Sequence, residues 1–126
     1  MDFEQALVFE LQTIIGLDSK VFPQIAPENT LPPLIVYISS EGEPIMTLSG
    51  PSDMTELSCE IHLDTQTYEQ LKSLSKATLD RVRSFFSRPI GENGPVIKSI
   101  TVTEPIEDID TATNYYKCSF DIRVRY

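Results

Sequence analysis

The chain has 126 residues, of which 40% are hydrophobic, and its formal net charge at pH 7 is −9. This length predicts one domain, residues 1–126, that can bury a core without disulfides or metal ions. The acidic charge disfavours a nucleic-acid reader, which needs clustered Lys and Arg. No apolar run reaches the roughly 20 residues of a membrane span, and the acidic start lacks the basic region of a secretory signal, so we expect synthesis in the cytoplasm.

The charge is unevenly divided along the chain. Residues 1–71 hold one basic residue and twelve acidic ones, whereas residues 72–126 hold nine basic residues and seven acidic ones. Such polarity suits subunits that meet copies of themselves or oppositely charged partners. A solubilising surface with accidental clustering explains it equally well.

The first element in chain order is a predicted helix over residues 3–15. Asp2 and Gln5 have the spacing of a capping box, and Gly16 is a typical helix stop. The expected buried face contains Phe3, Ala6, Leu7, Ile14 and either Glu10 or Leu11.

Proline dominates the next segment. Four prolines between residues 21 and 33 predict an extended connector, and the apolar run 34–39 that follows predicts a strand. Residues 41–53 are expected to form a loop by their Gly and Pro content. This loop carries Ile45, Met46 and Leu48, which either fold back onto the core or await a partner, and which are therefore a candidate interface.

The second half alternates between strands and a helix. Apolar residues at every second position from Leu57 to Leu63 predict a half-buried strand. A capping box at Thr67 opens a helix that should end near Ser87. Residues 96–103 are expected to form a third strand, residues 104–113 an acidic loop, and residues 116–126 a closing strand.

The predicted order is therefore α-β-β-α-β-β. Short connections between strands imply hairpins, and one-sided alternation implies helices on a single face. We expect an α+β two-layer domain with a four-stranded, mainly antiparallel sheet.

The solvent-exposed side of the strand over 57–64 carries Ser58, Glu60, His62 and Asp64. A serine, a histidine and two carboxylates together are typical of hydrolase active sites. Ser58 and His62 should lie about 13 Å apart along a strand, whereas a nucleophile and its base need about 3 Å. The solvent side of a half-buried strand is the simpler interpretation. We therefore expect no enzyme, no catalytic residue and no cofactor.

Metal and redox sites are not expected either. The single histidine has no ligand spacing around it, and Cys59 and Cys118 should both face the core as reduced thiols, although a disulfide between them is conceivable if their strands are neighbours. The acidic loop offers Glu104, Glu107, Asp108 and Asp110, which form either a weak divalent-ion site or a solvated hairpin tip.

The closing strand carries a basic side, with Lys117, Arg123 and Arg125 alternating with apolar residues. These three side chains are a candidate docking face for an acidic neighbour. A plain solvated strand face is the alternative.

Five stretches in order resemble the tail-completion proteins of long-tailed bacteriophages and prophages. They are VFPQIAP at 21–27, LPPLIVY at 31–37, LSGPSD at 48–53, EIHLDTQTYEQ at 60–70 and SFDIRVRY at 119–126. This family is also described as tail-to-head joining proteins and is related in fold to tail terminators. The likeness extends over nearly the whole chain, and no single stretch carries it alone.

The resemblance implies a structural protein of the virion, assembled in the host cytoplasm. Members are thought to form a ring, generally of six copies, at the head-proximal end of the tail tube. The implied partners are further copies of the chain, the tail tube protein and a head-completion or neck protein. DNA would pass through the ring without specific binding, and no membrane is involved. A head-completion or neck protein that contacts the portal, and a small cytoplasmic enzyme or ligand-binding module, are the alternatives.

Overall fold

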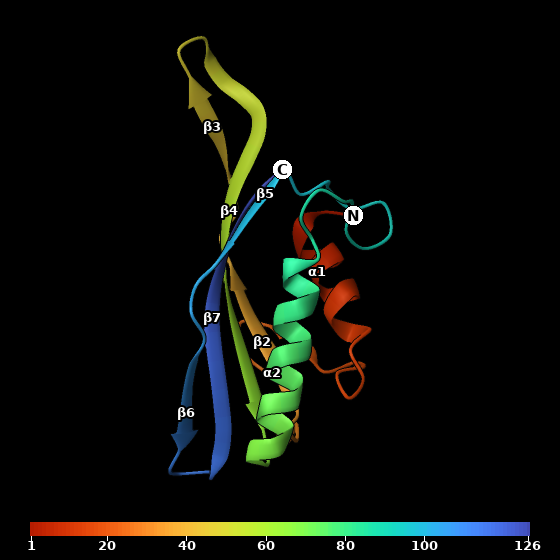
Figure 1. Ribbon diagram of the computed structural model, residues 1–126, viewed down its shortest axis with the longest axis vertical. Coiled ribbons are helices and arrows are strands. Elements are labelled where there is room, and N and C mark those ends of the chain that lie inside the picture. The colour runs from red at the N-terminus through yellow and green to blue at the C-terminus, as the bar shows by residue number, and fades with distance from the viewer.

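The computed structural model describes residues 1–126 and has a helical layer packed on one side of a twisted sheet (Figure 1). In chain order the elements are α1 (Phe3–Gln12), β1 (Val21–Pro23), β2 (Leu34–Ser39), β3 (Glu43–Thr47), β4 (Gly50–Thr65), α2 (Tyr68–Arg83), β5 (Ser99–Val102), β6 (Ile106–Asp110) and β7 (Tyr115–Arg125). No helix combines the length and the apolar character that crossing a membrane takes.

Two long strands, β4 and β7, form the centre of the sheet. They pair in antiparallel fashion from Glu56 opposite Arg125 to Thr65 opposite Tyr116. The other edge of β4 is shared by β3 and β2, and the other edge of β7 is shared by β5 and β6. The short β1 adds a parallel strand beside β2. The sheet is therefore mixed and has seven strands.

The prediction of a four-stranded, mainly antiparallel sheet in the order α-β-β-α-β-β is wrong. The additional strands come from segments expected to be irregular: β1 from the proline connector, β3 from the 41–53 loop and β6 from the acidic 104–113 loop. Each of these strands pairs along only one edge. β3 and β6 are largely exposed and so lack a regular apolar alternation, and β1 has only three residues, too few to show one. These segments are strands because their backbones form hydrogen bonds to a neighbouring strand. A local sequence pattern cannot predict such hydrogen bonds.

Four elements also have bounds that differ from expectation. The first helix ends at Gln12 instead of residue 15, with Thr13 as its C-cap, and the chain then turns through Gly16 at φ 95°. The long strand β4 begins at Gly50, well before Leu57. The strand expected over 96–103 is reduced to Ser99–Val102, because Val96 forms only an isolated bridge with Pro89. The second helix opens at its Thr67 cap as expected, but it ends at Arg83 instead of near Ser87, with Ser84 as its C-cap.

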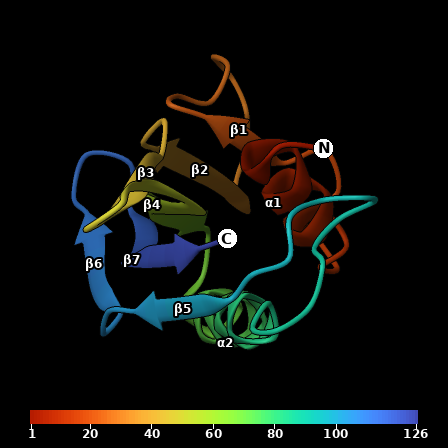
Figure 2. The ribbon, with the colours of Figure 1, turned by 90° about the horizontal axis from the view of Figure 1, so that it is seen from above.

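The core lies between the sheet and the two helices. Alternate residues of β4 and β7 point into it, and α1 and α2 cover this same side of the sheet (Figure 2). The largest fully buried side chains are Phe3, Phe85, Leu7, Leu11, Leu17, Ile35, Ile61, Leu63, Leu71, Ile90, Ile97 and Ile122. The opposite side of the sheet has no helix over it.

The end of β7 is fixed in this core. The ring of Tyr126 stacks on Phe3 of α1 at a centroid distance of 5.9 Å, and the backbone of Tyr126 exchanges two hydrogen bonds with Thr55. Figure 2 shows this end of the chain between the sheet and the helices. The last residue thus links β4 to α1.

Candidate interaction surfaces

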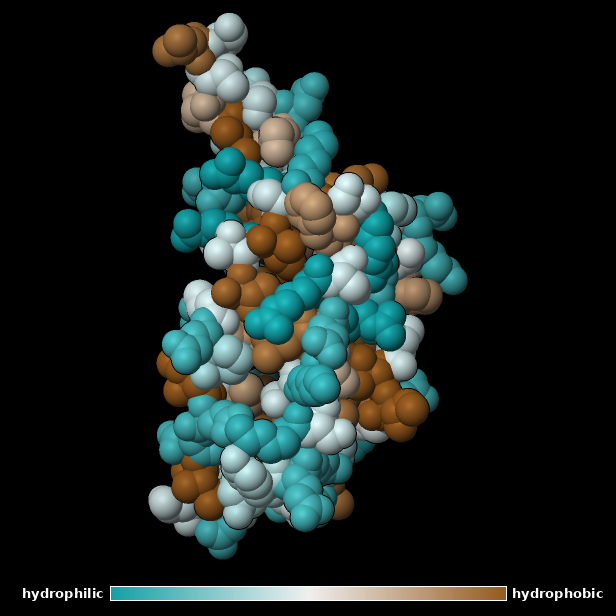
Figure 3. All heavy atoms as spheres, in the orientation of Figure 1, coloured by the Kyte–Doolittle hydropathy of each residue, from teal (hydrophilic) through white to brown (hydrophobic).

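The β3–β4 hairpin projects beyond the rest of the molecule (Figure 1). Leu48 and Ser49 form its turn, and the Thr47 hydroxyl donates a hydrogen bond to the Gly50 carbonyl at 2.8 Å. Leu48 is fully exposed and Met46 is 67% exposed, whereas Ile45 is partly buried. Apolar atoms gather at the tip in Figure 3. This is where the structure places the predicted apolar interface, but on a paired hairpin in place of the expected loop.

The charge of the hairpin changes along its length. Residues 44–52 carry no charge, whereas Glu41, Glu43 and Asp53 flank this stretch. The hairpin does not fold back over the core, so its tip cannot bury its apolar side chains within its own subunit. An exposed apolar tip of this kind is a typical contact site for another chain.

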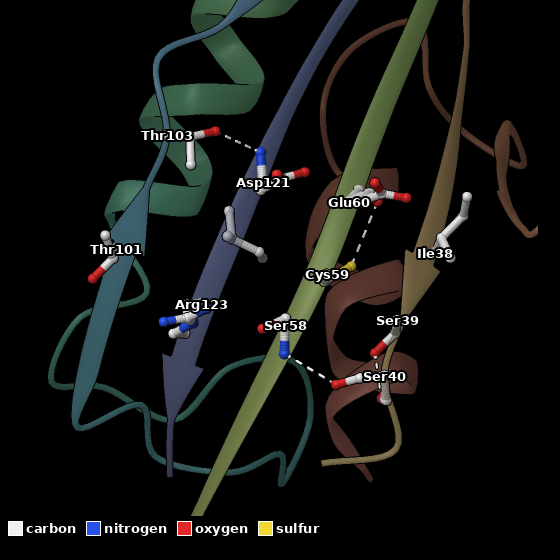
Figure 4. Close-up of a pocket in the computed structure, with 11 residues that line it drawn as sticks. Ile38, Ser39, Ser40, Ser58, Cys59, Glu60, Thr101, Thr103, Asp121 and Arg123 are labelled. Carbon is white, nitrogen blue, oxygen red and sulfur yellow. Dashed lines mark hydrogen bonds between the residues drawn. The ribbon is translucent and has the colours of Figure 1, made fainter. Parts of the chain in front are cut away.

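The uncovered side of the sheet, which we call the outer face, is hollowed. Two adjoining hollows of about 660 and 610 Å³ share Ile38. The first is lined by polar groups that include Ser58, Thr101 and Arg123 (Figure 4). The second is lined by aliphatic residues that include Val36 and Ile106 and by charged residues such as Asp64. The outer face therefore offers both apolar and polar contacts.

Carboxylates outnumber cations on the outer face. The strand register places Glu43, Glu56, Glu60, Asp64, Asp108, Asp110 and Asp121 there, together with Lys117, Arg123 and Arg125. Lys117 Nζ lies 3.5 Å from Asp64, and the two arginines each lie 3.4 Å from Glu56. The candidate docking cations are thus paired within the subunit, on a face whose net charge is negative.

The four residues of the predicted acidic loop do not converge. Glu107 points to the helix side and accepts a 2.6 Å hydrogen bond from Lys72, whereas Asp108 and Asp110 belong to the outer face. Asp110 accepts a hydrogen bond from the Ala112 amide, which lowers the pKa of its carboxyl. Glu104 precedes the strand and is exposed. No group of three or more His, Cys, Asp or Glu side chains is placed to hold a metal ion.

Ser58 and His62 lie on one straight strand with Glu60 between them. His62 Nε2 is 3.8 Å from Glu60, and the residues adjacent to Ser58 across the strands are Ser40 and Arg123. The spacing along the strand keeps Ser58 and His62 about 13 Å apart. The structure does not bring these two residues together.

The two cysteines are buried, free thiols. Cys59 lies opposite Ile122 and Cys118 lies opposite Leu63, so four strand positions separate them. Burial raises the pKa of the Cys59 thiol to about 12 and also raises the pKa of Cys118. Both therefore remain protonated and unreactive at neutral pH.

The helix side of the molecule carries the basic surface. Five of the ten basic residues lie between residues 72 and 88. Lys72 pairs with Glu107, but Lys76 and Arg83 are exposed and have no carboxylate within 4.0 Å. A shallow hollow of about 380 Å³ between α2 and Pro105 is lined by both cations.

A buried carboxylate joins the two helices. Glu10 is 5% exposed, and it accepts hydrogen bonds from Arg88 at 2.7 Å, the Gly91 amide at 3.0 Å and Arg81 at 3.4 Å. The helical periodicity left Glu10 and Leu11 as alternatives for one buried position, and both are buried. Arg81 and Arg88, which stabilise the buried Glu10 carboxylate, are more than 70 residues away in the chain, so the helical periodicity could not predict their contact with it.

We expect Glu10→Gln to destabilise the fold by about 2 kcal/mol at pH 7, because it leaves two arginines without their counter-charge. Burial alone raises the pKa of the Glu10 carboxyl, but Arg88, the Gly91 amide and Arg81 outweigh this effect and hold the pKa below its ordinary value of 4.5. The carboxylate therefore contributes stability above the ordinary pKa and loses this contribution as the pH falls through the lowered pKa. Urea unfolding of the unaltered protein and of the Glu10→Gln variant, at pH 7 and at successively lower pH, measures this loss of stability. If the difference in free energy of unfolding between the two proteins does not decrease as the pH falls, the prediction is wrong.

Comparison with known proteins shows a shared fold. The sequence matches no protein-family model and no curated protein. Among solved structures, the chain is similar to a chain of the "virion of native gene transfer agent (GTA) particle". The TM-score is 0.64 at 9% sequence identity, with 98% of this chain and 92% of the other chain covered. The chain therefore shares its overall fold with a component of that particle.

Proposed function

We propose that this protein is a structural component of a phage-type virion that caps the head-proximal end of the tail tube and joins the tail to the head. The observation that carries the proposal is the likeness over the whole length of both chains to a chain of a virion particle. The ordered sequence stretches that resemble tail-completion proteins support a place at the junction between tail and head. The proposed location is the head–tail junction of the virion, after assembly in the host cytoplasm.

The surfaces support an assembly role. The apolar tip of the β3–β4 hairpin has no partner in its own subunit, and the outer face is open. We propose that six copies form a ring that contacts the tail tube protein on one side and a head-completion or neck protein on the other. Closed rings use head-to-tail contacts between two different surfaces. The hairpin tip and the outer face are two different exposed surfaces of this subunit.

The net charge fits a passage for DNA. Six copies at −9 each give −54 for the ring. Acidic walls repel phosphates and so do not hold a passing DNA duplex. This is consistent with DNA that passes through the ring without specific binding.

Electron microscopy of the purified protein mixed with tail tubes tests the proposal. We expect a ring at one end of each tube and a halt to further tube growth. Rings bound to portal complexes and absent from tubes would assign the neck role instead. Tubes and portals that both stay bare would refute the proposed function.

A further inference from the structure

A surface of net negative charge and a surface with unpaired cations lie on opposite sides of this molecule. One is the outer face of the sheet, and the other is the exposed side of α2 with the residues that follow it. The core and the sheet separate them, so they cannot meet within one subunit (Figure 1). Each has unsatisfied charge and uncovered apolar surface.

On the outer face, two carboxylates oppose each other directly. Glu60 of β4 and Asp121 of β7 are paired residues of the sheet, and Figure 4 shows them on neighbouring strands. Neither forms an ion pair with Lys or Arg, and the nearest basic group to Glu60 is His62 at 3.8 Å. Like charges directly opposite destabilise a sheet. An external cation would remove this cost.

The same face is suited to a bulky partner. The second hollow has aliphatic side chains in its lining, and the exposed ones include Ile38 and Ile106. A partner for this face should therefore combine cations with apolar or aromatic side chains.

The exposed side of α2 has this composition. Lys76 and Arg83 are exposed two helical turns apart and have no carboxylate within 4.0 Å, although the exposed Asp80 lies between them in the helix. Tyr68 and Phe86, at either end of this surface, are 51% and 60% exposed. A convex helix with aromatic ends complements a hollowed sheet face in shape, and its two unpaired cations complement the acidic charge of that face.

We infer that the outer face of one subunit packs against the exposed side of α2 of a second copy. The inference rests on the ring proposed above and identifies the two surfaces that build it. Because the surfaces differ, the contact is head-to-tail and repeats around a closed ring. Lys76 and Arg83 then lie near Glu60 and Asp121 of the neighbouring copy.

Disulfide trapping between copies tests the contact. Ser58→Cys places a thiol on the outer face beside Glu60, and Ser73→Cys places one on α2 beside Lys76; both positions are exposed. The native cysteines are buried and do not compete. We expect a mixture of the two variants to form at least about ten times more mixed dimer than a matched mixture of Ser73→Cys with Thr111→Cys, an exposed position on the β6–β7 turn. The yield should fall in 1 M salt, where screening shortens to about 3 Å.

Charge exchange gives the decisive readout. Glu60→Lys with Asp121→Lys in the Ser58→Cys chain, or Lys76→Glu with Arg83→Glu in the Ser73→Cys chain, should each reduce the mixed dimer about tenfold. The two altered chains together should restore it. A yield equal to that of the Thr111→Cys control, or a failure of the exchanged pair to restore it, overturns the inference. If the contact fails this test but the unaltered protein still caps tail tubes, the proposed function stands. If mixed dimers are trapped but the protein does not cap tubes, the proposed function is refuted and the contact remains.

Discussion

Replacing Ile122 with aspartate should unfold the protein. Ile122 is 1% exposed and faces the core from β7, the strand that pairs with both β4 and β5. A carboxylate there loses its hydration and finds no cation, which costs about 4 kcal/mol or more. Domains of this size are stable by only about 5–15 kcal/mol. We expect the loss of the cooperative thermal transition, followed by circular dichroism.

The neighbouring position supplies the control. Arg123→Asp alters the next residue of the same strand, but its side chain is exposed on the outer face. It should fold with a transition within a few degrees of the unaltered protein, since an exposed ion pair contributes at most about 1 kcal/mol. Equal damage from both substitutions would show that β7 is not buried on one side only.

The double substitution Met46→Asp with Leu48→Asp should abolish capping of tail tubes while leaving the fold intact. Both side chains are exposed at the hairpin tip, so the free energy of unfolding should change by no more than about 0.5 kcal/mol. At an interface the same carboxylates must be desolvated against apolar surface, which opposes binding. The measurement is the fraction of capped tubes in electron micrographs, together with urea unfolding.

An apolar residue away from the hairpin provides the matched control. Ile15 is 93% exposed after the end of α1, so Ile15→Asp replaces one exposed apolar side chain with a carboxylate without touching the tip. This variant should cap tubes normally. If the hairpin variant caps tubes as well as Ile15→Asp does, the tip is not a contact with the tube.

The half-buried elements could be predicted because their patterns are local. The alternation of Leu57, Cys59, Ile61 and Leu63 is observed on the core side of β4, and the caps at Asp2 and Thr67 start α1 and α2. A side chain in a strand points to one side or the other, so the pattern records which side is buried. The strands β1, β3 and β6 were not predicted, because they form through hydrogen bonds to the neighbouring strands β2, β4 and β7.

The candidate surfaces show the same division. Ile45, Met46 and Leu48 could be selected from sequence as apolar residues without local packing, but their display on a projecting hairpin depends on β3 pairing with β4. Lys117, Arg123 and Arg125 could be placed on one side of a strand, but the counter-charges at Asp64 and Glu56 belong to β4. The unpaired cations Lys76 and Arg83 could not be distinguished from the other basic residues of α2.

The amino-acid sequence by itself determined a small acidic domain, its two helices, and a closing strand with one apolar side. Those features follow from periodicity, capping and composition, which act over a few neighbouring residues. Only the tertiary structure decided that β7 is a central strand, that the sheet has seven strands, and which charges are left without partners. The reason is physical: strand pairing and charge compensation join residues far apart in the chain, so they depend on how the elements meet in space.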